Sequence, residues 1–366
     1  MKISRVIISG GGTGGHIFPA VAIADEIKRR NPNADILFVG AKGKMEMEKV
    51  PAAGYRIEGL TIAGFQRKLT LSNFLLPFKI AGSMMAARKI VKDFKPQVVV
   101  GVGGYASGPT LKAATMLGIP ALIQEQNSFP GKTNKLLAKN VRSICVAYDG
   151  LDKYFPKEKI VLTGNPVRKE MVSIEGKRME AFEFYGFDST KPTVLIIGGS
   201  LGARTLNESV VDNYDKLVSS GLQVLWQCGK LYKSALDDHF NGSEADSIKR
   251  VMFIERMDLA YAMADVIISR AGAISVSELC LIGKPTILVP SPNVAEDHQT
   301  KNAMALVNKD SALIVKDVDA RTTLMDTALT LIKDDDRCKK LSDEILKLGK
   351  SNATIEIVDE LEKIIG

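Results

Sequence analysis

Residues that form disulfide bonds or bind zinc in small proteins are scarce in this sequence. Its 366 residues include only four cysteines and three histidines. The cysteines, Cys145, Cys228, Cys280 and Cys338, lie far apart and form no C-x-x-C pair, which argues against a zinc cluster and against a disulfide framework. Isolated thiols indicate a reducing compartment, and a chain of this length buries enough apolar surface without staples.

Long apolar runs are absent as well. No segment approaches 18 uninterrupted apolar residues, so we expect no transmembrane helix. The apolar run after Lys2 and Arg5 is too short for a signal peptide, and we therefore expect a cytoplasmic protein. The net charge of +7 is too small to predict a nucleic-acid partner, but it permits an anionic membrane surface or phosphorylated ligands.

Short β-branched runs alternate with amphipathic stretches, which predicts parallel sheets covered on both faces. In the first third of the chain, the predicted strands fall at 5–9, 34–40, 96–104 and 119–127. The alternation pauses at Asn165-Pro166 and then restarts. We therefore predict an α/β protein of two doubly wound, Rossmann-like domains, 1–163 and 164–349, with the C-terminal helix 350–366 joining the first domain.

A glycine-rich turn, GGGTGGH at 10–16, follows the first predicted strand. Its glycines match G-x-G-x-x-G, but a dinucleotide site also needs an acid at the end of the second strand. Gly40 and Lys42 stand there instead, and no lysine follows Gly15 as a Walker A loop requires. The turn therefore predicts either another phosphate site at a helix N-terminus or a tight packing turn without a ligand.

His16 stands at the start of the helix that follows this turn. It is either a general base near neutral pH or a capping, solvent-exposed histidine. Similar glycine turns follow other predicted strands, GVGGYASGPT at 101–110 and GGSLGA at 198–203. Because open parallel sheets bind ligands at the carboxyl ends of their strands, these turns are candidate anion sites.

Two polar segments of the second domain suit a sugar nucleotide. SRAGAISVSEL at 269–279 offers a helix start and Glu278, which either accepts hydrogen bonds from ribose hydroxyls or only interacts with the helix dipole. EDHQTKNA at 296–303 suits sugar hydroxyls or simple helix capping. The acidic runs 317–319 and 334–336 precede predicted helices and are interpreted as N-caps and solvated first turns, so no metal site is predicted.

Acidic residues are absent from 59–92. This stretch contains the following basic and large apolar residues: Arg67, Lys68, Lys79, Arg88, Lys89 and Lys92, with Phe65, Phe74, Leu75, Leu76, Phe78, Met84 and Met85. A basic surface with projecting apolar side chains suits an anionic membrane interface. The same apolar residues also suit the core side of a covering helix, and both interpretations stay open.

Seven motifs in this order resemble the MurG family, the peptidoglycan N-acetylglucosaminyltransferases of bacteria: GGGTGGHIFPA, GGYASGP, EQNSFPGKTN, TGNPVR, GGSLGA, SRAGAISVSEL and EDHQTKNA. The resemblance implies the GT-B fold, in which the two domains face each other across a cleft. It implies inverting transfer of N-acetylglucosamine from UDP-N-acetylglucosamine to the 4-hydroxyl of undecaprenyl-diphospho-N-acetylmuramoyl-pentapeptide, which is lipid I, to give lipid II. No metal and no cofactor are implied.

The resemblance also implies roles for individual residues. His16 would be the catalytic base. The donor would contact Thr13, Gly14, Gly15, Asn127, Arg168, Ser200, Ile254, Ala273, Ile274, Ser275, Val276, Ser277, Glu278 and Gln299. The acceptor would contact Gly14, Gly104, Tyr105, Ser107, Gly108 and Glu125. The protein is expected at the cytoplasmic face of the plasma membrane as a peripheral protein, in contact with other cell-wall synthesis proteins.

One position departs from the family pattern. Members commonly have histidine before E-Q-N, where this chain has Gln124. Gln124 cannot titrate near neutral pH, which leaves His16 as the better candidate for the base. Other functions remain open at this point: another GT-B transferase acting on a lipid acceptor, a UDP-N-acetylglucosamine 2-epimerase, a non-catalytic UDP-sugar sensor or a nicotinamide enzyme. The absence of an acid at the end of the second predicted strand argues against the nicotinamide enzyme.

Overall fold

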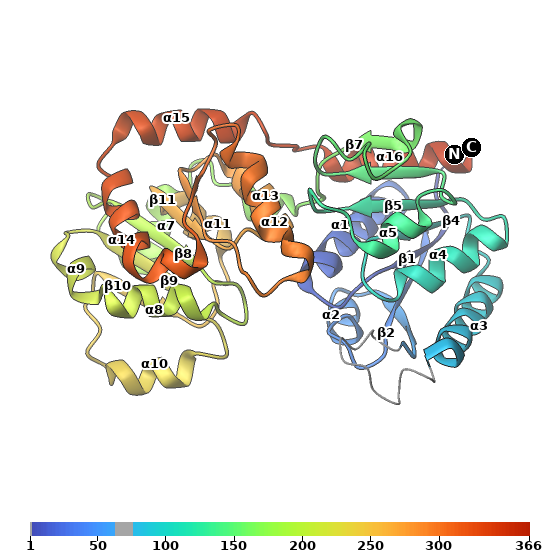
Figure 1. Cartoon of the computed structure of the whole chain (residues 1–366), viewed down its shortest axis with the longest axis horizontal. Helices are drawn as coiled ribbons and strands as arrows, with labels where there is room; N and C mark the ends of the chain where they lie inside the picture. Colours follow the sequence, from blue (N-terminus) through green and yellow to red (C-terminus); the bar gives the residue numbers. More distant parts are fainter. Residues whose placement is uncertain (1, 63–75) are drawn as a thin grey trace. The chain divides into compact units, whose positions relative to one another are not determined.

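The computed structural model describes residues 2–62 and 76–366 and divides the chain into two compact units (Figure 1). Unit 1 comprises Met1–Val167 together with Ser351–Gly366, and unit 2 comprises Arg168–Lys350. The division falls directly after Asn165-Pro166, where the sequence pattern pauses. Each unit is built on one parallel sheet, which confirms the predicted fold class of two Rossmann-like α/β domains.

Unit 1 has a seven-stranded sheet in the order β3-β2-β1-β4-β5-β6-β7. Its strands are β1 (Arg5–Ser9), β2 (Asp35–Ala41), β3 (Arg56–Leu60), β4 (Val98–Gly101), β5 (Ala121–Glu125), β6 (Ser143–Val146) and β7 (Ile160–Leu162). Its helices are α1 (Gly14–Arg30), α2 (Glu46–Ala52), α3 (Leu76–Phe94), α4 (Ser107–Met116), α5 (Lys132–Leu137) and α16 (Ala353–Ile365). Paired strands run parallel, with Ile8 opposite both Phe38 and Val100.

Alternate residues of β1 serve the two faces of this sheet, as the pleat of a strand requires. Val6 and Ile8 pack in one core with residues of α1 and α16. Ile7 packs on the other face with residues of α3, α4 and α5. Because both faces are covered, the strands read as continuous apolar runs in the sequence.

The C-terminal helix α16 packs against α1 in unit 1. Ile357, Val358 and Leu361 enter the shared core. Arg30, at the end of α1, donates to the Asp359 carboxylate at 2.6 Å and to the Glu362 carboxylate at 3.0 Å. Apolar packing and these ion pairs therefore hold α16 on unit 1, although it follows unit 2 in the sequence.

Unit 2 has a six-stranded sheet in the order β10-β9-β8-β11-β12-β13. Its strands are β8 (Thr193–Ile197), β9 (Gln223–Gln227), β10 (Ile248–Val251), β11 (Val266–Ser269), β12 (Thr286–Leu288) and β13 (Leu313–Ile314). Its helices are α6 (Lys169–Val172), α7 (Arg178–Tyr185), α8 (Arg204–Asp212), α9 (Tyr214–Ser219), α10 (Lys233–Phe240), α11 (Met257–Met263), α12 (Ala273–Ile282), α13 (His298–Val307), α14 (Ala320–Leu331) and α15 (Asp335–Leu346). Trp226 on β9 is fully buried and donates its Nε1–H to Asn207 on α8 at 2.9 Å, so the sheet and its covering helix are joined by a satisfied polar contact.

Candidate functional site

Two glycine turns at the carboxyl ends of β1 and β4 interlock in unit 1. A Cβ added to Gly104 would lie 2.4 Å from the Gly11 carbonyl oxygen, and one added to Gly10 would lie 2.2 Å from Cγ2 of Val102. Gly104 also has φ +85°, a conformation that side chains rarely adopt. These glycines are therefore needed for the close packing of the two turns, which places both turns at one edge of the sheet.

His16 lies in the first turn of α1, and its ring is oriented by this packing. Its Nδ1 is 2.8 Å from the Gly11 carbonyl oxygen and 3.5 Å from the Thr13 hydroxyl. Because a carbonyl oxygen only accepts, Nδ1 carries the hydrogen and the neutral ring has its lone pair on Nε2. Nε2 lies against Gly103, where a Cβ would come within 2.8 Å. This tautomer is the one a general base acting through Nε2 requires.

The remaining predicted residues of this region lie on the same turns. Thr13 is the N-cap of α1, and Gly14 and Gly15 form its first positions. Tyr105 is 57% exposed, and the buried Ser107 hydroxyl donates to the Gly104 carbonyl at 2.9 Å. Gly108 lies in the first turn of α4, close to Thr133. Helix starts and glycine turns together direct backbone N–H groups to the carboxyl edge of the sheet.

Glu125, at the end of β5, organises its own loop. The residue as a whole is 2% exposed. One carboxylate oxygen accepts from the Asn127 backbone N–H at 3.1 Å and from the Asn127 amide at 3.3 Å. The other accepts from the Gly131 N–H at 3.1 Å and from the Asn134 amide at 2.8 Å. The carboxylate holds the β5–α5 loop in shape, so this geometry favours an indirect role for Glu125 toward a ligand.

Gln124 belongs to a buried chain of amides. Its Nε2 donates to the Asn165 side chain at 2.9 Å, and Asn165 donates to the Gln126 carbonyl at 3.0 Å. Gln126 in turn donates to the Val102 carbonyl at 2.9 Å. Gln124 is fully buried. Gln124 therefore has a structural role: it links the ends of β4 and β5 to Asn165, near the boundary with unit 2.

Sequence reasoning missed Glu46, the first residue of α2. The residue as a whole is 1% exposed. It accepts from the Gly12 N–H at 2.7 Å and from the Ala41 N–H at 2.9 Å, so it joins the glycine turn to the end of β2. Gly40, which stands where a dinucleotide site would have its acid, was the one sequence signal for this contact. A Cβ at position 40 would lie 2.6 Å from Cγ of Glu46, so the glycine leaves room for the Glu46 side chain.

Unit 2 contains a cavity of about 820 Å³ at the carboxyl ends of β8, β11 and β12. Residues of the glycine turn after β8, the start of α12 and the loop after β12 line it, including Gly199, Gly202, Gly272, Ser275 and Gln299. Polar groups predominate in its walls, and the helix dipole of α12 is positive at this end. The cavity is a suitable site for an anionic, hydroxyl-rich ligand.

Of the residues predicted to contact the donor, two line this cavity. Ser275 and Gln299 line it, and Gln299 accepts from the Ser291 N–H at 2.8 Å. Ser200 is exposed in the turn after β8, between two glycines that line the cavity. The segment Ala273 to Ser277 forms the start of α12. Ile254, after β10, is 2% exposed.

Glu278 lies one turn into α12 and accepts from the Tyr261 hydroxyl at 3.0 Å. Burial raises the pKa of Glu278 to about 7, although the Tyr261 hydrogen bond and the positive charge of Arg168 both act to lower it. Burial also raises the pKa of Tyr261, which keeps that hydroxyl a donor. The structure thus brings Arg168, Glu278 and Tyr261 together within unit 2, and Glu278 changes charge near neutral pH.

The interpretation of 317–319 as solvated residues is wrong for Asp317. Its side chain is 19% exposed and pairs with Arg270. Its other oxygen accepts from the Thr205 hydroxyl at 2.9 Å, and Arg270 also donates to the Val289 carbonyl at 3.0 Å. Thr205, Arg270 and Asp317 all line the cavity of unit 2, where they connect the start of α8, the turn after β11 and the segment before α14.

The other acidic run behaves as predicted. Asp334 caps α15, and its carboxylate accepts from the Arg337 N–H at 2.9 Å. Over residues 2–62 and 76–366, no three His, Cys, Asp or Glu side chains gather as metal ligands would.

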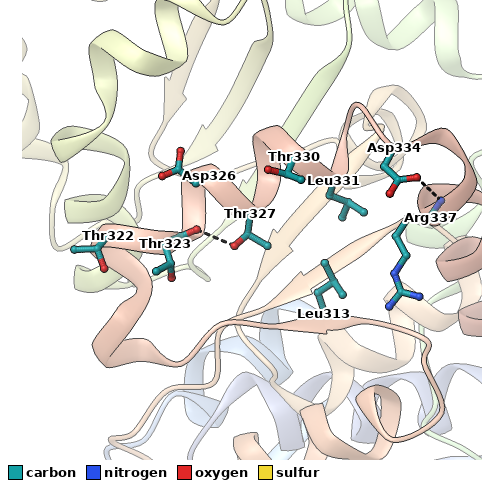
Figure 2. A pocket seen from close by; sticks show the side chains of 9 residues that line it. All are labelled: Leu313, Thr322, Thr323, Asp326, Thr327, Thr330, Leu331, Asp334 and Arg337. Carbon is teal, nitrogen blue, oxygen red and sulfur yellow. Dashed lines mark hydrogen bonds between the residues drawn. The ribbon is translucent and has the colours of Figure 1, made fainter.

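A further hollow of about 440 Å³ lies beside α14 and β13 (Figure 2). Its charged side chains already have partners: Asp334 caps α15, Asp326 pairs with Lys216 at 2.8 Å, and Arg337 pairs with Asp310. Threonines and two leucines form the rest of its wall. None of the predicted site residues lines this hollow, and we assign it no function.

Where it is described, the acid-free stretch has apolar side chains both against the core and on the surface. Met84 packs against the core of unit 1. Met85 is 69% exposed and Ile80 is 51% exposed on α3. Residues 63–75 lie outside the described part of the chain, and with them Phe65, Arg67, Lys68, Phe74 and Leu75. Among the described helices, none is long and apolar enough to cross a membrane.

Comparison with known proteins gives the same family for both units. The model of the glycosyltransferase family 28 N-terminal domain matches residues 6–146, and that of the C-terminal domain matches residues 193–357. The crystal structure of Acinetobacter baumannii MurG is similar, with a TM-score of 0.78 and 29% identity, covering 98% of this chain and 99% of that one.

Sequence relatives extend over the whole chain. A Phocaeicola vulgatus protein is 56% identical and covers 98% of this chain and 96% of its own length. A Flavobacterium psychrophilum protein is 53% identical and covers 100% of this chain and 99% of its own. Both are named UDP-N-acetylglucosamine--N-acetylmuramyl-(pentapeptide) pyrophosphoryl-undecaprenol N-acetylglucosamine transferase. The chain is therefore a glycosyltransferase that belongs to family 28 and, within it, to the pyrophosphoryl-undecaprenol N-acetylglucosamine transferases.

Proposed function

We propose that this enzyme transfers N-acetylglucosamine from UDP-N-acetylglucosamine to the 4-hydroxyl of undecaprenyl-diphospho-N-acetylmuramoyl-pentapeptide, with inversion and without a metal ion. The observation that carries the proposal is the identity of more than half the residues, over the full chain, with relatives named for this transfer. The geometry of each unit supports it separately.

Unit 2 is proposed to hold the donor. Its cavity of about 820 Å³ has the size of a nucleotide-sugar site and is lined by glycine turns and the start of α12. In this proposal, backbone N–H groups near Ser200 and Ala273 to Ser277 bind the diphosphate, with Arg168 nearby. Glu278 accepts from the ribose hydroxyls, Ile254 contacts the base, and Gln299 binds the sugar.

Unit 1 is proposed to hold the acceptor and supply the base. The turns that include Gly14, Gly104, Ser107 and Gly108 offer backbone N–H groups to the acceptor diphosphate. Tyr105 is exposed beside them. Thr13, Gly15 and Asn127 are proposed to contact the donor, and Glu125 is proposed to act by shaping the loop that presents Asn127.

The reaction is a single displacement at the anomeric carbon. The acceptor oxygen forms a bond to that carbon as the bond to the UDP phosphate breaks, which inverts the configuration. The proton of the acceptor hydroxyl goes to Nε2 of His16, whose tautomer is set by the Gly11 carbonyl. Negative charge that develops on UDP is stabilised by the start of α12 and by Arg168.

We further propose that unit 1 binds the anionic cytoplasmic face of the plasma membrane, where a lipid-linked acceptor resides. Helices α3, α4 and α5 pack side by side (Figure 1) and carry exposed Ile80, Met85, Met116 and Leu136. Exposed Arg88, Lys89 and Lys92 add positive charge on α3. Contacts with other cell-wall synthesis proteins at that surface belong to the same proposal.

Replacement of His16 tests the catalytic assignment. We expect His16→Ala to lower kcat by roughly 100-fold, because proton transfer in the transition state contributes on that scale. Its Kd for UDP-N-acetylglucosamine should stay within about twofold of wild type, since unit 2 holds the donor. His239→Ala, which removes an exposed histidine of unit 2, is the matched control. Wild-type turnover by a folded His16→Ala enzyme would refute the assignment.

A further inference from the structure

Glu46 and His16 hydrogen-bond to opposite ends of one peptide group. The Gly12 N–H donates to the Glu46 carboxylate at 2.7 Å. The carbonyl of the same peptide, that of Gly11, accepts from Nδ1 of His16 at 2.8 Å. The three groups therefore form a continuous hydrogen-bonded chain, from a buried carboxylate through one amide to the imidazole.

The neighbouring glycines are shaped around this carboxylate. A Cβ on Gly11 would lie 2.2 Å from Cδ of Glu46 and 2.3 Å from its Oε1. The positive φ of Gly11, +152°, belongs to the same close approach. Because Oε1 of Glu46 also accepts from the Ala41 N–H at 2.9 Å, both oxygens are fixed and the carboxylate cannot rotate away from the turn.

This arrangement has two physical consequences for the imidazole. A carboxylate that accepts from an amide N–H polarises that amide and makes its carbonyl oxygen a stronger acceptor. The chain also holds the Gly11 carbonyl in one orientation, which keeps the hydrogen of His16 on Nδ1. Carboxylates that orient a histidine directly act in the same two ways.

We propose that Glu46 is a positioning residue that fixes the tautomer and orientation of His16 through the Gly11–Gly12 peptide. The inference rests on the proposed role of His16 as the base. The proposed role of Glu46 differs from that of the acid in dinucleotide sites, which binds ribose. The Glu46 carboxylate binds backbone N–H groups of the protein itself, those of Gly12 and Ala41.

The test combines a charge-removing substitution with a direct view of the histidine ring. Glu46→Gln keeps the size of the side chain but loses the charge. We expect kcat to fall by about tenfold, the scale on which partners behind a functional histidine act. KM for UDP-N-acetylglucosamine should change by less than about twofold. The ¹⁵N shifts of His16 should move from the Nδ1–H tautomer toward a mixture. Glu48→Gln removes the same charge from an exposed position of α2 and is the matched control.

A wild-type measurement covers the case in which Glu46→Gln does not fold. In the unaltered protein, the Gly12 amide proton should resonate far downfield and exchange slowly because it donates to a buried carboxylate. A fast-exchanging Gly12 amide, or an unchanged His16 tautomer in folded Glu46→Gln, would overturn the proposal. The ring spectra need no substrate, so they still test this inference if His16→Ala shows that the base is elsewhere.

Discussion

At the scale of single residues, Glu278 is the clearest case of a group whose surroundings set its chemistry. Burial raises its pKa to about 7, whereas an exposed glutamate titrates near 4.3. Tyr261 already donates to one of its oxygens, which leaves acceptor capacity for a ligand. A ribose that donates two hydroxyl hydrogens would favour the ionised carboxylate, so ligand binding and proton release should be linked.

We therefore predict that UDP-N-acetylglucosamine binds more weakly as the pH falls. Protonation of Glu278 below pH 7 removes an acceptor, so Kd should rise by about tenfold between pH 8 and pH 6. The diphosphate diester of the ligand does not titrate in this range. Calorimetry on wild type and Glu278→Gln provides the check, and the variant should bind more weakly at pH 8 with little pH dependence. An equal pH dependence in both proteins would rule out Glu278 as the source.

The position of His16 was predictable because the signal for it was local. His16 follows directly on a glycine turn, and the structure does place it at the start of α1 with its ring held by that turn. Glu46 was missed because its carboxylate reaches the turn from α2, after a strand and a loop. Asp317 was misinterpreted for a similar reason: its partner Arg270 is 47 residues away in the sequence.

At the scale of elements, strands and helices were predictable because buried parallel strands leave continuous apolar runs. Unit 1 ends its first segment at Val167, close to the pause in the pattern at Asn165-Pro166. The acid-free stretch was ambiguous, since one helix can serve core and surface on different faces. On α3, Met84 and Met85 are adjacent in the sequence, yet Met84 packs against the core and Met85 is 69% exposed.

We predict that α3 contributes to membrane binding. The protein should sediment with vesicles that contain anionic lipid, and added salt should weaken this binding because it screens the basic side chains. Met85→Glu should lower the bound fraction by severalfold, since it places a negative charge on the exposed face. Met179→Glu is the matched control, because Met179 is a similarly exposed methionine, 66%, on α7 of unit 2. Absence of binding at low salt would contradict the membrane proposal.

At the scale of the whole molecule, the two units share one kind of glycine turn but place different functional groups near it. Each has a glycine turn after a central strand, and each turn packs backbone on backbone: Gly104 against Gly11, and Gly202 against Cys228. The unit 2 turn lines a polar cavity, and Glu278 on α12 is the carboxylate proposed to contact the ribose. Around the unit 1 turn lies an oriented imidazole. In the proposed function, the two units serve one metal-independent reaction, the transfer of N-acetylglucosamine to a lipid-linked acceptor.

One transfer experiment tests this proposed reaction most directly. The purified protein is incubated with labelled UDP-N-acetylglucosamine and a short-chain lipid I analogue in the presence of EDTA, and the products are separated. We predict a β-linked disaccharide on the lipid and release of UDP in equal amount, with no loss of rate from the chelator. No disaccharide, with conversion of the donor to UDP-N-acetylmannosamine, would contradict it and indicate an epimerase.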